Sequence, residues 1–549
     1  MAKSMAYNPA AGLAGMLKEG HKTFDGVQGA VLRNIEAARG IAAMVTTSLG
    51  PNGMNKLVIN HLEKIIVTSD SATIMRELEV AHPAAKMLAM AGESQETEFG
   101  DNTNFVISFG GELLKLAEDL IRDGLHTSEI VTGYQRAYEK ALELLPTLVV
   151  KSVQNVRDRE EMIGAIKSVI ATKQSGYEDF LSGLVVDACL TTFPPSARNP
   201  RLSIDNVRIA KLIGGSVVQS SMIKGMVVIR DTEGIIKKAE NAKVIVFGCG
   251  IEAAQAEAKA TVLLKNADEL MNYNKSEEKA MEDVIAAIAA TGVKVVICNG
   301  SISEMAMHFL DKFGLMVVKI QSKFDLRRIC GALGATAVVR LGPCTPEEMG
   351  ECSLVEVKEI GAKKVTIFKQ DLDEDTSIAT ICIRASTMHV MNDVERALDD
   401  GIGSVKTLCD DPRLLPGAGA VELELNKLLK SFANEVVGLD QYAIRKFADA
   451  FNVVPRTLAE NSGCDPTATM FALHQSHVAE GGQNMGFDID ANIPRDSSTA
   501  GVFDLYATKV NALRLAVDAA ITILRVDQIV MSKPAGGPKM PQGGGGDGM

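Results

Sequence analysis

The N-terminal part of the chain alternates between stretches with helically spaced apolar side chains and short polar breaks. Between Gly26 and Thr47 the apolar side chains share one helical face, at Val27, Val31, Ile35, Ala38, Ala42 and Val45. A second helix is predicted to end near Glu98, and a third to run from about Phe105 to Arg122. Two strand-like pieces, 56–60 and 65–68, are joined by a short polar link and predict a β-hairpin.

From Gly214 the pattern changes to short β-branched runs, at 225–229, 242–247, 293–298, 315–320 and 335–339. Helical segments at 303–313 and 325–333 alternate with the later runs, which predicts an α/β domain with at least some parallel strands. The segment from Ile251 to Lys279 reads as a mobile, mostly helical excursion that could form a binding surface.

Further strands are predicted at 363–369 and 380–384, and a helix at 390–408. Helices are predicted to fill most of the remainder to about Met531. The Gly/Pro-rich tail, 534–549, lacks residues with which to build a core and is predicted to be disordered.

The first candidate site is formed by the short polar segments that precede helices. Asp101 lies in the break Gly100–Asn104, Asp70 opens another helix, and Gly50 and Gly53 flank a Gly-Pro turn. A helix that begins after Gly-Asp offers unpaired N–H groups and the positive end of its dipole, while the Asp can hold a hard cation. This combination suits a metal-bound phosphate, although for each Asp taken alone an ordinary N-cap is the commoner role.

Other candidate residues favour structural interpretations when considered singly. Lys173 is typical of a solvated surface lysine, and Asp393, Asp399 and Asp400 are typical of a solvated acidic helix face, so the pattern does not select Asp400. The Gly248-Cys249-Gly250 turn follows a strand but lacks the third glycine of a dinucleotide-binding turn.

His474 and His477 could together ligate a metal ion. They have no Cys or acidic partner nearby in the sequence, so solvated histidines are the favoured interpretation.

Composition excludes several classes of protein. The chain has 549 residues, enough for two to four domains, and a formal net charge of −12 with no basic stripe, which disfavours nucleic-acid binding. No uncharged stretch could span a bilayer, and Met1 to Ala14 lacks the pattern of a targeting segment, so neither a membrane nor an export role is expected. The nine cysteines form no Cys-x-x-Cys pair and are predicted to be reduced core thiols of a cytosolic protein.

Five motifs occur in the order and spacing of the group II chaperonins, which the chain resembles from about residue 20 to 532. They are Leu49–Met54, Asp70–Ile74, Gly100–Thr103, Gly417–Gly419 and Pro455–Asn461. The resemblance implies a multidomain α and α/β chaperonin fold: a mostly helical equatorial domain, a small intermediate domain, and an α/β apical domain with a helical lid protrusion at 251–279. The implied boundaries are 1–148 and 405–532 for the equatorial domain, 149–213 and 370–404 for the intermediate domain, 214–369 for the apical domain, and 533–549 for a disordered tail.

The resemblance also implies site residues, here carried over by position. Phosphates would be surrounded by Leu49, Gly50, Pro51, Asn102, Thr103 and Asn104, with Asp101 on Mg²⁺. Asp70 and Asp400 would flank the γ-phosphate and the attacking water, and Lys173 would sense that phosphate. Gly417, Ala418, Gly419 and Asp504 would lie by the ribose and adenine of ATP.

The implied function is an ATP-hydrolysing subunit of a hetero-oligomeric double ring of paralogous chaperonin subunits, which binds non-native proteins in the cytoplasm. Four departures from the family pattern keep a second hypothesis open: Asn52 replaces Lys, and Ser71, Asn102 and Ala418 replace Gly. Ala in a left-handed conformation costs about 1 kcal/mol. The alternative is therefore a mainly structural ring subunit that holds nucleotide with weak or no turnover. A small-molecule enzyme is less favoured, since no nucleophile-base pair stands out.

Overall fold

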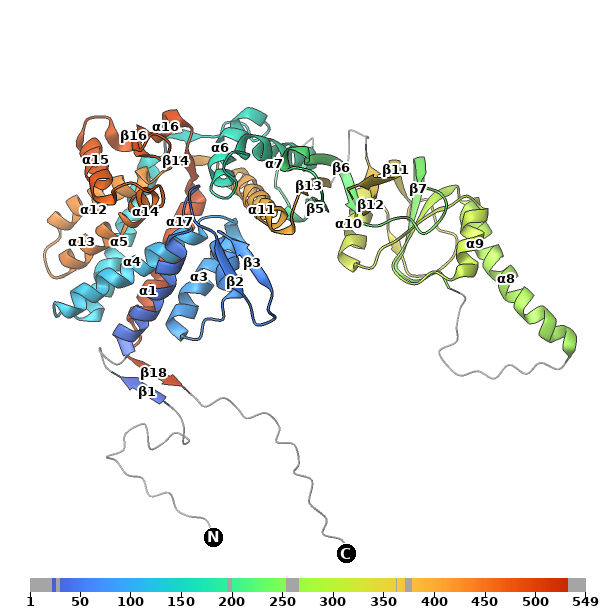
Figure 1. The fold of residues 1–549 in the computed structure, drawn as a ribbon, viewed down its shortest axis with the longest axis horizontal. Coiled ribbons are helices and arrows are strands. Elements are labelled where there is room, and N and C mark those ends of the chain that lie inside the picture. Colours follow the sequence, from blue (N-terminus) through green and yellow to red (C-terminus); the bar gives the residue numbers. More distant parts are fainter. Residues whose placement is uncertain are drawn as a thin grey trace, which may run out of the picture.

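The computed structural model describes residues 22–25, 30–194, 200–252, 266–361, 363–370 and 378–531. Three bodies lie in a row: a helical body, a smaller middle body, and a body built on a large sheet, beyond which helix α8 projects (Figure 1). The predictions for the tail 534–549 and for part of the excursion at 253–265 fall outside the described residues.

The helical body is built from both ends of the chain. Its larger helices are α1 (Leu32–Thr46), α3 (Pro83–Phe99), α4 (Thr103–Arg122), α5 (Thr127–Leu144), α12 (Ala420–Glu435), α13 (Asp440–Ala450), α14 (Val453–Asn461), α15 (Pro466–Val478) and α17 (Tyr506–Leu524). They share one hydrophobic core, which contains residues from Val31 to Leu145 and from Leu415 to Leu524. Burial of apolar area therefore joins two segments that lie far apart in the sequence.

Helix α4 runs through the centre of this core. Phe109 has ring centroids of Phe105, Phe447 and Phe451 within 4.7–5.8 Å, so one aromatic cluster connects α4 to α13. Gly111 allows α1 to approach closely, because a Cβ at that position would lie 2.2 Å from the Cβ of Ala42. A central, closely packed α4 fixes the position of its N-terminus, where the Gly100–Asn104 break lies.

Short elements surround the helical body. These are the hairpin β2 (Lys56–Ile59) and β3 (Ile65–Thr68), helix α2 (Ser71–Glu77), the hairpin β15 (Met485–Asp488) and β16 (Ile493–Asp496), helix α16 (Ser497–Ala500), and β1 (Lys22–Asp25) paired with β18 (Gln528–Met531). The predicted hairpin at 56–68 is confirmed, with antiparallel register from Lys56 opposite Thr68 to Ile59 opposite Ile65.

The middle body packs three helices around a second core: α6 (Arg159–Ala171), α7 (Glu178–Thr192) and α11 (Met388–Asp410). They lie beside the strands β5 (Val207–Ile213) and β13 (Ala379–Ala385), which pair in parallel. A small antiparallel sheet of β17 (Phe503–Leu505), β14 (Arg413–Pro416) and β4 (Lys151–Ser152) leads into the helical body.

A mixed sheet continues from the middle body into the third body in the order β5-β13-β6-β12-β11-β7-β8-β9, with β10 (Ala337–Val338) beside β7. Its remaining strands are β6 (Ser221–Val228), β7 (Lys238–Phe247), β8 (Val293–Cys298), β9 (Met316–Lys319), β11 (Gly350–Ile360) and β12 (Lys363–Lys369). β7, β8 and β9 pair in parallel, as the sequence predicts.

Helices cover both faces of the parallel part of this sheet. α8 (Ala267–Ala290) and α9 (Glu304–Lys312) pack on one face, and α10 (Lys323–Leu333) packs on the other. Strands buried on both faces read as the continuous apolar runs that the sequence contains. The expectation of combined helical and α/β parts is therefore confirmed.

Within the described residues, none of the helices has both the length and the apolar character needed to cross a bilayer. None of the nine cysteines, all within the described residues, forms a disulfide bond. Five of them, Cys189, Cys298, Cys344, Cys352 and Cys382, are buried as predicted for core thiols, and the other four are half-buried.

Candidate functional site

The Gly100–Asn104 break forms a tight turn between α3 and α4. Gly100 and Asn102 both adopt left-handed backbone conformations, with φ of 80° and 66°, and α4 starts at Thr103. The Thr103 hydroxyl donates to Glu96 Oε2 at 3.1 Å, and Gln95 Nε2 donates to the carbonyl of Asp101 at 2.9 Å. These bonds fix the turn, so the half-buried Asp101 carboxylate lies beside the N-terminus of α4.

The Gly50-Pro51 turn follows α1 and lies beside this helix start. Asn104 Nδ2 donates to the hydroxyl of Ser48 at 3.1 Å, and Asn461 Nδ2 donates to the carbonyl of Leu49 at 2.8 Å. Gly50 has φ of 83°, and a Cβ there would lie 2.6 Å from Leu458 Cδ2, so the position requires glycine.

Asp70, Lys173 and Asp400 meet where the middle body contacts the helical body. Lys173 Nζ lies 3.1 Å from Asp70 Oδ1 and also pairs with Asp400 Oδ2. Asp70 is in addition the N-cap of α2, with its Oδ2 accepting from the N–H and the hydroxyl of Thr73. Asp400 is 2% exposed, so the interpretation of this part of α11 as a solvated acidic face is wrong for Asp400, although the adjacent Asp399 is exposed.

The surroundings of these three groups shift the pKa values of the two carboxylates in opposite directions. Burial acts to raise the pKa of Asp70, but the Lys173 ammonium and hydrogen bonds from Thr73 outweigh it and hold that pKa at about 2. Burial raises the pKa of Asp400 well above its usual range against the attraction of Lys173. Burial acts to lower the pKa of Lys173, but Asp400 and Asp70 raise it, so the lysine keeps its charge.

Negative charge exceeds positive charge in this part of the protein. Burial also raises the pKa values of Glu96 and Asp101, and their neighbouring carboxylates add to the effect. In the described part of the chain, no three His, Cys, Asp or Glu side chains are grouped to hold a metal ion alone. Mg²⁺ is usually bound by one or two carboxylates together with the phosphates of a ligand, so the excess acidity and the position of Asp101 fit such an ion.

The opposite wall is formed by the turn before α12 and by the β15–β16 hairpin. Ala418 has φ of 57° and Gly419 has φ of 82°. Asp504 lies close by on β17, and its Oδ2 is 2.8 Å from Lys509 Nζ, which also lies 2.7 Å from Glu422 Oε1. The buried Lys509 ammonium thus holds Asp504 at the edge of the cavity.

These parts enclose one cavity of about 740 Å³. Its lining includes every site residue that the family resemblance implies except Gly417: Leu49, Gly50, Pro51, Asp70, Asp101, Asn102, Thr103, Asn104, Lys173, Asp400, Ala418, Gly419 and Asp504. Gly417 lies directly behind the lining, where its N–H donates to the carbonyl of Val502 and its carbonyl accepts from Ser497 Oγ.

Sequence reasoning missed several charged residues that line this cavity, and three of them lie near the predicted site residues: Glu96, Glu422 and Lys509. Each lies inside a helix, without the adjacent glycine or turn that marked the other candidates.

The expectation that both histidines of α15 are solvated is wrong for His477. It is 2% exposed, its Nδ1 lies 3.0 Å from Glu424 Oε2, and its Nε2 lies 2.7 Å from the carbonyl oxygen of Met485. The acidic partner comes from α12, more than fifty positions away in the sequence, so no local pattern could reveal it.

The Gly248-Cys249-Gly250 turn serves backbone packing. A Cβ at Gly250 would lie 2.7 Å from the carbonyl oxygen of Ser301, whereas a Cβ at Gly248 would make only ordinary contacts of 3.8 Å. Close backbone packing therefore explains Gly250 without a dinucleotide.

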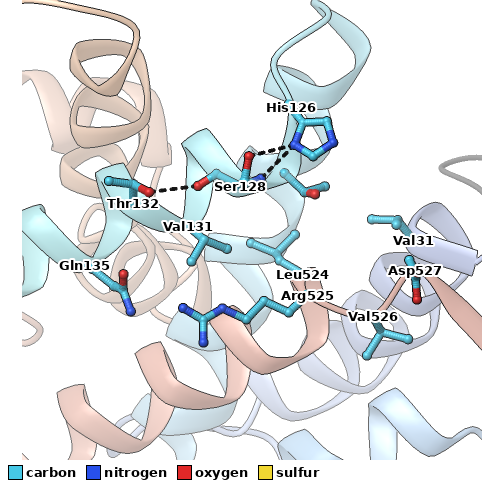
Figure 2. Close-up of a pocket in the computed structure, with 11 residues that line it drawn as sticks. Val31, His126, Ser128, Val131, Thr132, Gln135, Leu524, Arg525, Val526 and Asp527 are labelled. Carbon is cyan, nitrogen blue, oxygen red and sulfur yellow. Dashed lines mark hydrogen bonds between the residues drawn. The ribbon is translucent and has the colours of Figure 1, made fainter.

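A second cavity, of about 640 Å³, lies between the start of α5 and the end of α17. Figure 2 shows Val131, Leu524 and Val526 on its walls, with His126 bonded to Ser128 at the start of α5. Asp527 is the one carboxylate among its lining residues, so it lacks the charge arrangement of the larger cavity.

Comparisons with known proteins agree with this geometry. Residues 41–534 match the family described as the TCP-1/cpn60 chaperonin family. T-complex protein 1 subunit theta of Dictyostelium discoideum is 48% identical over 533 residues, which are 97% of this chain and 98% of that protein. The subunit of the same name from Gallus gallus is 49% identical over 536 residues, 97% of each chain, and that of Arabidopsis thaliana is 46% identical over 530 residues, 96% of each chain.

Details outside the five motifs agree with these matches. Asn104-Phe105, the run Asp399-Asp400-Gly401 and the segment 529–537 look most like the theta subunit of the eukaryotic cytosolic chaperonin, called CCT or TRiC.

Proposed function

Because this chain belongs to the TCP-1/cpn60 chaperonin family, we propose that it is an ATP-hydrolysing subunit of a protein-folding chaperonin ring. The observation that carries the proposal is the Lys173 ammonium between Asp70 and Asp400 in one cavity with the N-terminus of α4. Phosphoryl transfer needs charge neutralisation and an aligned water more than covalent chemistry. A helix N-terminus, a lysine and buried carboxylates supply both requirements.

The phosphates of ATP are held where the Gly50-Pro51 turn meets the start of α4. The first residues of α4 line the cavity, where the unpaired N–H groups of a helix start can bind phosphate, and Thr103 contributes a hydroxyl. Asp101 would hold Mg²⁺, which when bound neutralises phosphate charge. Asn104 acts mainly by tying the Gly50-Pro51 turn to α4, since its side chain bonds to Ser48 and to the carbonyl of Val45.

Asp400 and Asp70 orient the attacking water, and Asp400 accepts its proton. The pKa of Asp400, raised by burial, suits a carboxylate that takes up a proton during hydrolysis. Lys173 turns from its two carboxylate partners to a γ-phosphate that enters the cavity, and it thereby senses that phosphate. The base and ribose lie against Gly417–Gly419 and Asp504, with Asp504 held by Lys509.

Domain roles follow the same proposal. Residues 1–148 and 405–532 form the equatorial ATPase domain, 149–213 and 370–404 the intermediate domain, and 214–369 the apical client-binding domain with its lid protrusion. The shared core of both chain ends supports the equatorial assignment. The partners are paralogous subunits in a cytoplasmic hetero-oligomeric double ring and non-native client proteins.

A second candidate function is a mainly structural subunit that holds nucleotide with little turnover. The left-handed backbones of Asn102 and Ala418 favour it, because a Cβ stands at two positions of strained backbone on the cavity wall.

Nucleotide titration of the full chain in the presence and absence of Mg²⁺ tests the binding site. Asp101→Ala is expected to abolish the Mg²⁺-dependent part of the affinity, because the hard cation loses its charged protein ligand. Asp123→Ala, at the exposed far end of α4, is the matched control. Unchanged Mg²⁺-dependent affinity in Asp101→Ala would remove this residue from the metal.

A further inference from the structure

Arg396 joins the helix that carries Asp400 to the turn that carries Asp70. It lies on α11 one turn before Asp400, on the same side of the helix. Its Nη1 donates to Thr68 Oγ1 at 3.1 Å and to Asp393 Oδ1 at 2.9 Å. Arg396 is 20% exposed and Asp393 is 21% exposed, so both side chains lie largely within the contact between the middle body and the helical body.

Thr68 connects this contact to Asp70. Its hydroxyl oxygen accepts the N–H of Asp70 at 3.0 Å as well as the Arg396 guanidinium, and the residue is 1% exposed. One buried oxygen therefore fixes both the backbone of the Asp70 turn and the side chain of a residue on α11.

The same two elements are joined a second time through Lys173, which pairs with Asp70 and Asp400. The two connections close a ring: Thr68 to Arg396, along α11 to Asp400, then through Lys173 to Asp70 and back to Thr68. The two connections differ in one respect. The Lys173 ammonium faces the cavity and is available to an anionic ligand, whereas Thr68 and Arg396 are not among the cavity residues.

We propose that Arg396 is a positioning residue that keeps Asp400 and Asp70 at a fixed separation when Lys173 turns to bound phosphate. This inference rests on the proposed ATPase function. Two polar links between the Asp70 turn and α11 are described above, one through Lys173 and one through Thr68 and Arg396. When a phosphate engages Lys173, the Thr68–Arg396 bond is the one that remains. This bond keeps both carboxylates within reach of the same water molecule. Arg396 itself contacts neither the water nor the nucleotide.

The first test is hydrogen exchange on the assembled ring without nucleotide, followed in peptides that cover 66–78. Arg396→Met is expected to speed exchange at Asp70 and along α2, because the Thr68 hydroxyl loses the donor that orients it. Glu395→Gln is the matched control, since it breaks the neighbouring α11 ion pair to Lys211, 2.7 Å long, which faces β5. Equal exchange in both variants would overturn the proposal.

The second test is single-turnover hydrolysis together with ATP affinity, in rings where this chain is the one hydrolysis-competent subunit. Arg396→Met and Thr68→Val are each expected to slow hydrolysis about tenfold with affinity within about twofold, the size of effect of one charged hydrogen bond. Thr68→Ser keeps the hydroxyl and is expected to restore the rate. The double variant is expected to be no slower than the slower single variant, because both changes remove one shared link.

Failure of this inference and failure of the proposed function give different results. A parent ring without hydrolysis contradicts the ATPase proposal, and the exchange measurement then still tests the Arg396–Thr68 link. A parent ring that hydrolyses ATP at the same rate as Arg396→Met overturns the positioning role alone, as do rate losses that multiply in the double variant.

Discussion

The ammonium group of Lys173 lies 3.1 Å from Oδ1 of Asp70, and the two side chains are 13% and 6% exposed. The pair connects α6 and its following turn in the middle body to the start of α2 in the helical body. The carboxylate of Asp400 shares the same ammonium group. Which of the two carboxylates has its charge compensated therefore depends on the position of the Lys173 ammonium.

Asp70→Asn is expected to lower stability in a pH-dependent way. Asp70 has a pKa of about 2 in the folded chain, below its usual value of 3.8, so its stabilising contribution is present above about pH 4. That contribution, about 2 kcal/mol for a shift of this size, is lost as the pH falls toward 2. Urea unfolding of parent and variant between pH 6 and pH 2.5 should show a gap that narrows with acid. Asp179→Asn, which alters an exposed ion pair with Lys167, should show almost no gap, and a pH-independent gap for Asp70→Asn would contradict the account.

Glycine at positions 102 and 418 is expected to change nucleotide affinity or release. Asn102 and Ala418 have φ of 66° and 57°, which glycine adopts without the strain of a Cβ. Relief of about 1 kcal/mol per site corresponds to a change of about fivefold in affinity or off-rate. Glu63→Gly is the control, because Glu63 has φ of 57° in the β2–β3 turn, outside the cavity. If Glu63→Gly alters nucleotide release as much as the two cavity variants, local strain at the site is not the cause.

His477→Leu is expected to destabilise the wall of the cavity that β15 forms. The substitution leaves Glu424 and the carbonyl of Met485 without a buried partner, at a cost of about 1–3 kcal/mol. His474→Leu, one turn earlier on α15 and partly exposed, should cost much less. Thermal unfolding of the two variants measures the loss of stability in each. Equal losses would show that packing of the imidazole, rather than its hydrogen bonds, stabilises this wall.

The sequence predicts those parts of the cavity wall in which glycine or acidic residues stand at a turn or a helix start. Gly50, Asp70 and Asp101 lie at turns or helix starts, where glycine and acidic residues have a recognisable local role, and these segments do converge. The predicted strands β7, β8 and β9 are likewise long apolar runs, which is the pattern of a strand buried on both faces.

The sequence does not predict groups whose role depends on a distant partner. Asp400 resembles a solvated helix residue until α11 packs on α3, where a Cβ at Gly403 would lie 2.7 Å from the carbonyl oxygen of Phe99. Strand β11 was not predicted because its apolar residues are interspersed with Glu351, Glu356 and Glu359. Its order comes from pairing with β7 on one side and β12 on the other, which no local pattern encodes.

The central claim, that this chain hydrolyses ATP through Asp400, is tested by single-turnover hydrolysis in a ring whose other subunits are inactive. Asp400→Ala is compared with Asp399→Ala, the adjacent exposed residue of α11, and nucleotide affinity is measured for both. The account predicts that Asp400→Ala slows hydrolysis by about 10² or more with little change in affinity, since the carboxylate acts mainly in the transition state. Asp399→Ala should hydrolyse ATP like the parent. Hydrolysis by Asp400→Ala at the parent rate would contradict the catalytic assignment, and a parent rate at background would favour the structural subunit.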